Sequence, residues 1–381
     1  MRFGAYHLAR LKALARAGAQ QGIRVVALEV ASLDHYPWEL RADADGLHRH
    51  TLFPDASYSQ LRATEIRARV QAALSHHQPD VVAINGWSVP EARAAQAWCQ
   101  RQRVPTVLMS ETKADDGEGP RPWWKERIKA HLVGRSHAAL VGGRPQMAYL
   151  TQLGFPPPQI FLGYDAVDNA YFTTQAHHWR RDPAQARADA GLPERYFFAC
   201  TRFLPRKNLD GLLRAYAAYR RITLDESTQP PWDLVLAGSG EAEPALRQLQ
   251  AELALSGVHW PGFLTYDQLP LYFSLASAFV HPAKIEAWGL VVNEAAASGL
   301  PLLVGESVGA AHELVQPGRN GCCFDPNNDA AITDALLAVS RLSDTERRAM
   351  GDHSLQIVAD WGPERFAQGM LAAMQCALDH S

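Results

Sequence analysis

Residues 281–301, HPAKIEAWGLVVNEAAASGLP, decide the fold class of this chain. The apolar run that ends near His281 predicts a buried strand, and the pattern after it predicts a helix that begins near Gly289. Gly299 and Pro301 form a stop signal for that helix. A strand, a loop and a helix in this order make up half of a βαβ unit, the building block of parallel sheets.

The same alternation of short apolar runs and amphipathic runs extends through most of the 381 residues. Because a single hydrophobic core rarely grows beyond roughly 250–300 residues, we expect two α/β domains. The predicted strands are 22–30, 80–85, 105–109, 137–141, 159–162, 196–200, 233–237, 257–260, 277–281 and 301–304. The predicted helices are 7–20, 57–76, 88–102, 122–134, 143–152, 206–219, 241–255, 289–298, 329–340 and 343–380, the last with a break at 361–363.

The periodic pattern pauses once, in a polar stretch without a strand, which predicts a linker at 164–195. Residues 1–163 and 196–355 each have the length of one doubly wound, Rossmann-like domain. Residues 356–381 are expected to form a C-terminal helix. The first domain begins unusually, because only four residues precede its first helical run. We therefore expect its first strand to be very short or missing.

Composition excludes several classes of protein. With 37 Lys and Arg against 40 Asp and Glu, the net charge is -3, which argues against nucleic acid as the main partner. Neither a run of about 18 apolar residues nor the apolar core of a signal peptide is present. The five cysteines contain no CxxC pair, so we expect reduced thiols and a cytoplasmic protein.

The helix that follows the strand ending at His281 predicts an anion site. The first backbone amides of a helix have no partners inside it, so those of Gly289, Leu290 and Val291 suit a diphosphate. Glu286 lies before this helix and Glu294 on its second turn. Carboxylates accept directed hydrogen bonds from sugar and ribose hydroxyls. The alternative is a solvated helix with two incidental glutamates.

Two cations follow the strand predicted at 196–200. Arg202 and Lys207 lie in the segment TRFLPRKN, at the carboxyl edge of the second sheet, where open α/β folds bind ligands. Cations there would stabilise the charge that develops on a departing diphosphate. The alternative is that both face water.

Glycine turns follow two further strands. Gly238, in the segment LVLAGSG, begins an incomplete dinucleotide motif, because Glu243 occupies the position of the third glycine. This pattern suits a close approach of backbone to a ligand as well as it suits a nicotinamide cofactor. Gly262 and Phe263 form a similar turn in the segment WPGF, where a nucleobase could stack or meet main chain.

The first domain offers fewer candidate residues. Glu111 follows the strand predicted at 105–109 and could orient an acceptor hydroxyl, or act as a helix cap or loop charge. Gly4 and His7 lie where the first strand would meet the first helix, and His7 is a candidate acceptor contact.

A segment rich in Trp and basic residues lies at 121–135, and it has the composition of an interfacial helix on anionic membranes. The alternative is an amphipathic helix that packs its Trp and Ile side chains inward. The residues expected to contact a membrane are Trp123, Trp124, Lys125, Arg127 and Lys129.

These segments resemble the family-4 retaining glycosyltransferases, which have the GT-B fold of two Rossmann-like domains facing across a cleft. The resemblance covers most of the chain. It rests on TRFLPRKN, LVLAGSGEAE, VHWPGF, HPAKIEAWGLVVNEAAASGLPLLV and QPGRNGCCFDP in the second half, and on VGGRPQMAYLTQLGFPPPQIFLGYDAVDNAYF in the first.

The resemblance implies a nucleotide-diphosphate sugar as donor, a hydroxyl acceptor, retention of configuration and neither a metal nor another cofactor. Such enzymes act in polysaccharide, glycolipid or natural-product glycosylation, and membrane contact would be peripheral, at the inner face. Arg202 and Lys207 would hold the diphosphate, and Glu286 would contact the sugar. The remaining donor contacts implied are Gly289, Leu290, Val291, Glu294, Gly238, Gly262 and Phe263.

Three alternatives remain. A sugar-nucleotide epimerase or hydrolase of the same fold would need no acceptor. A non-catalytic protein would bind the nucleotide sugar without transfer. A nicotinamide oxidoreductase requires a full G-x-G-x-x-G motif, which the sequence lacks.

Overall fold

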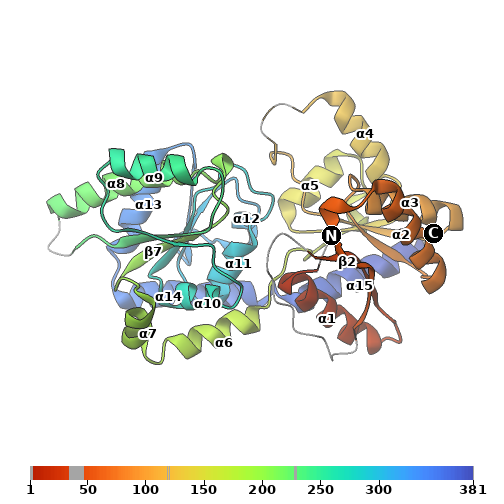
Figure 1. Cartoon of the computed structure of the whole chain (residues 1–381), viewed down its shortest axis with the longest axis horizontal. Coiled ribbons are helices and arrows are strands. Elements are labelled where there is room, and N and C mark those ends of the chain that lie inside the picture. Colours follow the sequence, from red (N-terminus) through yellow and green to blue (C-terminus); the bar gives the residue numbers. More distant parts are fainter. Residues whose placement is uncertain (1–2, 34–46, 118, 120, 227–229, 381) are drawn as a thin grey trace. The chain divides into compact units, whose positions relative to one another are not determined.

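The computed structural model describes residues 3–33, 47–117, 119, 121–226 and 230–380. The chain divides into two compact units, coloured along the sequence in Figure 1. Unit 1 comprises Met1–Asp168 and Trp361–Ser381, and unit 2 comprises Asn169–Asp360. Every strand pair described in either unit is parallel, as the βαβ pattern predicts.

The described strands of unit 1 form two separate sheets. One sheet pairs β1 (Val26–Leu33) with β2 (His48–Ser57). The other has the order β3-β4-β5-β6. Its strands are β3 (Val82–Asn85), β4 (Thr106–Ser110), β5 (Ala138–Val141) and β6 (Ile160–Leu162). Strands β1 and β3 are therefore edge strands of two different sheets.

Two of the apolar cores in unit 1 are each built by a pair of helices on the strands. Helices α1 (Ala5–Ala19) and α15 (Pro363–Asp379) lie side by side (Figure 1) and share one apolar core with β4 and β5. Helices α2 (Ala63–His77) and α3 (Pro90–Gln102) share another with β1 and β2. The remaining helices are η1 (Tyr58–Gln60), α4 (Trp123–Val133), α5 (Arg144–Gln152) and η2 (Pro157–Gln159).

Unit 2 contains one six-stranded sheet with the order β12-β11-β10-β7-β8-β9. The order reverses at β7, because β8 and β9 extend the sheet one way and β10 to β12 the other. Such a switch point, at the carboxyl ends of the strands, is where open α/β sheets bind ligands. The strands are β7 (Tyr196–Cys200), β8 (Asp233–Ala237), β9 (Val258–Gly262), β10 (Ala278–His281), β11 (Leu302–Gly305) and β12 (Gly321–Phe324).

One apolar core of unit 2 lies between its sheet and the helices α8 (Leu209–Glu226) and α13 (Asp329–Ser340), with Phe197, Tyr216 and Tyr219 fully buried. The helices before β9 are α6 (Asn169–Trp179), α7 (Pro183–Ala190), η3 (Pro205–Lys207), α8 (Leu209–Glu226) and α9 (Glu243–Glu252). Those after it are α10 (Leu269–Leu275), α11 (Leu290–Ala297), α12 (Ala311–Leu314), α13 (Asp329–Ser340) and α14 (Asp344–Ala359).

Residues 164–195, assigned to a linker from the sequence, hold α6 and α7, and both helices belong to unit 2. Helix α7 has clear boundary signals. The Asp182 carboxylate accepts a hydrogen bond from the Gln185 amide (3.2 Å), Pro183 opens the first turn, and Gly191 ends the helix at a φ of 63°. The polar composition that suggested a linker is that of two surface helices.

The first described element is α1. The sequence predicted a first strand that is very short or missing before this helix. Phe3 and Gly4 belong to no strand, and residues 1 and 2 lie outside the described residues. None of the helices in the described ranges has both the length and the hydropathy needed to cross a bilayer.

Candidate functional site

Three polar side chains meet at the switch point of unit 2. His281 is the last residue of β10, Glu286 lies in the loop that follows, and Lys207 ends η3 after β7. Lys207 Nζ donates to Glu286 Oε2, and His281 Nε2 lies 3.2 Å from the same oxygen. Both His281 and Lys207 are buried. The Glu286 carboxylate is thus held by the last residue of β10 and by a lysine that follows the adjacent strand β7.

The ionisation of this cluster follows from its contacts. Burial raises the pKa of Glu286, but the hydrogen bond from His281 and the charge of Lys207 outweigh burial and lower the pKa to about 2. Burial lowers the pKa of His281. At neutral pH Glu286 is therefore ionised and His281 neutral. A neutral His281 can bond to the carboxylate only by donating its Nε2–H.

Gly289 forms the turn between this cluster and α11. Its backbone is left-handed, with φ 96° and ψ 67°, a conformation that favours glycine. A Cβ at this position would lie 3.2 Å from Glu286 Cγ and 3.1 Å from Val308 Cγ1. Leu290 and Val291 follow as the first residues of α11. The structure therefore brings the Glu286 side chain against the turn that leads into the predicted anion site.

Glu294 is buried on α11. Cys200 is the last residue of β7. Its pKa is raised mainly by burial and to a smaller extent by the negative charge of Glu294. The Glu294 carboxylate therefore lies near the carboxyl end of β7. Most residues of α11 are buried. The alternative of a solvated helix is therefore wrong, whereas the roles of Glu286 and Glu294 in binding a ligand stay a prediction.

The two predicted cations have different environments. Lys207 is buried against Glu286, so the alternative that both cations face water is wrong for Lys207. Arg202 lies earlier in the same loop and is exposed. Arg202 is thus accessible to an anion from solvent, whereas Lys207 is fixed by its carboxylate partner.

Gly238 serves the packing of loops against one another. Its φ is 137°, and a Cβ there would overlap the carbonyl oxygen of Thr201. The Gly238 amide donates to the Gly262 carbonyl (2.8 Å), and the Phe203 amide donates to the Ser239 carbonyl (2.9 Å). The glycine-rich turn suggested a close approach of backbone to a ligand, but the backbone that approaches Gly238 is that of the chain itself. Phe263, beside this contact, is exposed.

In unit 1, polar residues gather where β3, β4 and β6 end. The hydroxyl of Tyr164 donates to Asn85 Oδ1 (3.2 Å), and Arg10 donates to the Tyr164 carbonyl (2.7 Å). Burial and then the charge of Glu111 raise the pKa of Tyr164, which places Glu111 near this group. The sequence pointed to Glu111 but not to Asn85 or Tyr164. Their position directly at strand ends is the signal that would have found them.

His7 caps its own helix. Its Nδ1 accepts a hydrogen bond from the Gly4 amide (3.2 Å) at the N-terminus of α1. Burial and then the charge of Arg10 lower the pKa of His7 to about 4, so the ring is neutral at neutral pH. Helix capping gives both Gly4 and His7 a structural role. Their contact with an acceptor substrate stays a prediction.

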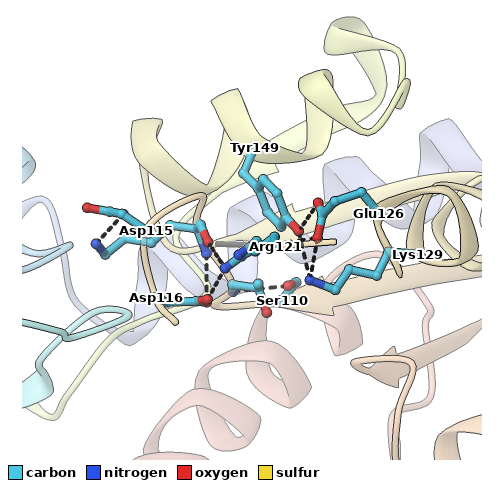
Figure 2. A network of polar contacts seen from close by, with 9 residues as sticks. Ser110, Asp115, Asp116, Arg121, Glu126, Lys129 and Tyr149 are labelled. Carbon is cyan, nitrogen blue, oxygen red and sulfur yellow. Dashed lines mark hydrogen bonds and ion pairs between the residues drawn. The ribbon is translucent and has the colours of Figure 1, made fainter. Parts of the chain in front are cut away.

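A polar network anchors the loop that carries Glu111 (Figure 2). Tyr149 on α5 donates to Glu126 Oε2 (2.7 Å), and Lys129 Nζ donates to Glu126 Oε1 (2.8 Å). The guanidinium of Arg121 lies 4.7 Å from the centre of the Tyr149 ring and pairs with Asp116 in the loop. The far end of the loop is therefore tied to both α4 and α5.

Helix α4 presents apolar and basic side chains to solvent. Trp123, Trp124 and Ile128 are 74%, 50% and 52% exposed, so the alternative that they pack inward is wrong. Lys125 Nζ lies 5.4 Å from the centre of the Trp124 ring, and Arg127 is also exposed. Lys129, predicted with this group, is engaged in the Glu126 network instead. We call Trp123, Trp124, Lys125, Arg127 and Ile128 the α4 surface.

A cavity of about 710 Å³ lies at the other end of the unit 2 sheet, where Arg195 and Trp232 precede β7 and β8. It is remote from the switch point. Among the described residues, no group of three His, Cys, Asp or Glu side chains is arranged to hold a metal ion.

Comparison with known proteins assigns the chain to a class. The pattern of the family described as "Glycosyl transferases group 1" matches residues 182–354, and that of the "Glycosyl transferase 4-like domain" matches residues 8–163. The chain belongs to the family-4 glycosyltransferases that these two patterns describe. It is similar to solved structures over nearly its whole length, which confirms the predicted GT-B fold class.

Among relatives, the chain is 32% identical over 198 residues to a GDP-mannose-dependent alpha-(1-6)-phosphatidylinositol monomannoside mannosyltransferase of Mycobacterium tuberculosis, covering 48% of this chain and 49% of the relative. It is 31% identical over 294 residues to a D-inositol 3-phosphate glycosyltransferase of a Nocardioides species, covering 72% and 62%. The chain spans about half the length of the first of these relatives.

Two solved structures illustrate the shared fold. Anabaena HepE in complex with UDP and glucose has a TM-score of 0.70 at 17% identity, with 97% of this chain and 96% of HepE covered. Sucrose-phosphate synthase from Thermosynechococcus elongatus has a TM-score of 0.72 at 20% identity, with 95% and 90% covered.

Proposed function

We propose that this protein transfers a sugar from a nucleotide-diphosphate donor to a hydroxyl acceptor, with retention and without a metal or other cofactor. The observation that carries the proposal is the contact of Lys207 and His281 with Glu286, beside the N-terminus of α11. A carboxylate kept ionised next to a helix N-terminus places an acceptor of sugar hydroxyl hydrogen bonds beside a site for the diphosphate.

In this proposal each donor contact has a distinct role. The amides of Gly289, Leu290 and Val291 and the exposed Arg202 bind the diphosphate. Glu286 binds the sugar, and Lys207 fixes Glu286 and adds positive charge near the leaving group. The other proposed contacts are Glu294 with the ribose and the Gly262–Phe263 turn with the nucleobase, where Phe263 is exposed for stacking.

The proposed reaction is a front-face displacement. The bond between the anomeric carbon and the diphosphate oxygen breaks, and the acceptor oxygen bonds to the same face of that carbon. The acceptor proton passes to the departing diphosphate oxygen, so a side-chain base is not required. Arg202, Lys207 and the α11 amides stabilise the negative charge that develops on the leaving group.

We propose that unit 1 recognises the acceptor through the polar residues at its strand ends, with Glu111 accepting a hydrogen bond from a hydroxyl. One relative carries phosphatidylinositol monomannoside in its name, and another D-inositol 3-phosphate. A polyol, free or attached to a lipid, is therefore the acceptor class that we favour. The α4 surface suits a cytoplasmic enzyme that contacts an anionic membrane peripherally.

Incubation of the purified protein with UDP and GDP sugars, each with and without polyol acceptors, tests this proposal. Transfer predicts a glycosylated product only when donor and acceptor are both present. Release of free sugar at the same rate without acceptor would instead indicate a hydrolase, and an altered sugar nucleotide an epimerase. Donor binding without turnover in any mixture would indicate a non-catalytic binding protein.

The stereochemistry and the metal requirement need separate readouts. Retention predicts that the product keeps the anomeric configuration of the donor, which NMR of the glycoside measures. Metal independence predicts an unchanged rate in the presence of EDTA. Inversion, or a loss of activity that added divalent cations restore, would contradict these parts of the proposal.

A further inference from the structure

The two partners of Glu286 contact the same carboxylate oxygen. Lys207 Nζ donates to Oε2, and His281 Nε2 donates to Oε2 over 3.2 Å. Within the described part of the chain, Oε1 accepts no hydrogen bond from a protein group. The Glu286 side chain is 19% exposed. The carboxylate is therefore divided, because Oε2 faces the protein and Oε1 is left to accept a hydrogen bond from a ligand.

His281 itself has no access to a ligand. Its side chain is 1% exposed, and its ring stacks on that of Phe279, with the ring centres 6.1 Å apart. Its backbone is fixed as well, because β10 lies between β7 and β11 and His281 pairs with Val304. Any effect of the His281 side chain on a bound ligand must therefore pass through Glu286.

Lys207 and His281 differ in what they supply to Glu286. An ammonium group is a compact charge with three rotatable donors, so Lys207 can bond to the carboxylate and to a diphosphate together. The imidazole of His281 is rigid and neutral, since burial lowers its pKa, and it directs one N–H at Oε2. Lys207 therefore supplies charge, whereas His281 supplies direction without a charge that would attract the phosphates.

The backbone around Glu286 is held without the His281 side chain. The Gly309 amide donates to the Glu286 carbonyl (3.3 Å), and the Lys284 amide donates to the Arg206 carbonyl (2.9 Å). The freedom that remains is rotation of the Glu286 side chain about its own bonds. A carboxylate held only by a lysine can rotate and exchange its two oxygens, whereas a second, directional donor selects one orientation.

We propose that His281 is a positioning residue, which donates to Oε2 of Glu286 and so fixes the carboxylate with Oε1 toward the sugar of the donor. Because it assigns Glu286 to the sugar and the α11 amides to the diphosphate, this inference rests on the proposed function. It follows that His281 controls recognition of the sugar and leaves recognition of the nucleotide unaffected.

The test compares two replacements of similar size in the full chain. His281→Gln keeps an N–H donor near the position of Nε2, whereas His281→Met removes the donor at nearly the same side-chain volume. Calorimetry measures the affinity of each variant for UDP, GDP, UDP-glucose and GDP-mannose, and urea unfolding checks that each is folded. If His281→Met does not fold, His281→Asn takes its place, because its amide is one bond shorter than that of Gln.

We expect His281→Met to weaken binding of the preferred nucleotide sugar by roughly tenfold or more, and binding of the free nucleotide by less than about twofold. His281→Gln should recover most of the loss. In a Glu286→Ala background, His281→Met should cause no further loss, because His281 acts only through Glu286.

Equal weakening of nucleotide and nucleotide sugar would overturn the proposal, as would equal affinities of the Gln and Met variants or a further loss in the Glu286→Ala background. A wild-type protein that binds neither nucleotides nor nucleotide sugars would instead overturn the proposed function, and this inference with it. The two failures are distinguishable, because only the second removes nucleotide binding from the wild type.

Discussion

Lys207 donates a hydrogen bond to Glu286 across 79 positions of sequence, and the pair lies where the strand order of unit 2 reverses. Each residue follows a different strand, Lys207 after β7 and Glu286 after β10. The pair therefore exists only when these two strands lie side by side, and it links formation of the sheet to formation of the proposed donor site.

Lys207→Met is expected to destabilise unit 2 by about 3 kcal/mol, because removing one member of a buried ion pair leaves the other charge uncompensated. Urea unfolding measures the change. The control is Lys207→Met combined with Glu286→Gln, which removes both charges and should recover more than half of the loss. Neither variant should transfer sugar. A single variant as stable as wild type would contradict the pairing.

Acid should weaken unit 2 through Glu286. Its pKa is about 2 in the folded protein against 4.5 for a free glutamate, so the unfolded chain binds more protons between these values. The contribution of Glu286, about 3 kcal/mol, is complete above pH 4.5 and is lost as the pH falls toward 2. His281 acts in the same direction from about pH 6.5 downward, because its folded pKa is also lowered.

Glu286→Gln provides the check on this acid response. Its free energy of unfolding should vary less with pH than that of wild type over the range where Glu286 titrates. Chemical unfolding at a series of pH values measures both curves. Parallel curves would show that the folded pKa of Glu286 is not lowered.

Gly238→Ala should destabilise unit 2 by about 4 kcal/mol or more, because its methyl group would overlap the Thr201 carbonyl in a left-handed backbone. Gly262→Ala is the matched control. Gly262 also has a positive φ, 81°, but a Cβ there meets no atom within 4 Å, so only about 1–2 kcal/mol of backbone strain is expected. Equal losses in the two variants, measured by chemical unfolding, would show that strain rather than the loop contact explains Gly238.

If the α4 surface binds membranes, the double variant Trp123→Ser/Trp124→Ser should partition into anionic lipid vesicles roughly tenfold or more weakly than wild type. Vesicle sedimentation measures the partition. Leu224→Ser is the matched control, because Leu224 is 62% exposed on α8 in unit 2. Unchanged partition of the Trp variant, or an equal effect of Leu224→Ser, would argue against a membrane role for α4.

The sequence was most informative where local pattern and buried environment agree. All ten predicted strands are present, because strands covered on both faces are continuous apolar runs. Strand β2 was missed because its sequence, HRHTLFPDAS, is largely polar and several of its residues are exposed. Strand β12 has only four residues and lies among turn-forming residues.

The proposed donor site could be found from sequence only in part. Glu286, Gly289 and Glu294 lie close together in one segment, so a single strand-to-helix pattern reveals them. His281 was seen only as the end of a strand, because its contact with Glu286 depends on how the following loop folds back. Arg202 faces water, whereas Lys207 contacts the Glu286 carboxylate. This difference likewise depends on tertiary packing, which the sequence pattern does not reveal.

Helix α15 is the last described element of the chain, yet it packs on α1, β4, β5 and β6, all of which precede unit 2. On the ribosome, the whole of unit 2 is therefore synthesised before the helix that completes the apolar core of unit 1. Unit 2 can close while unit 1 still exposes the surface that α15 covers. The core of unit 1, the unit whose residues emerge first, can therefore be completed only after the whole of unit 2 has been synthesised.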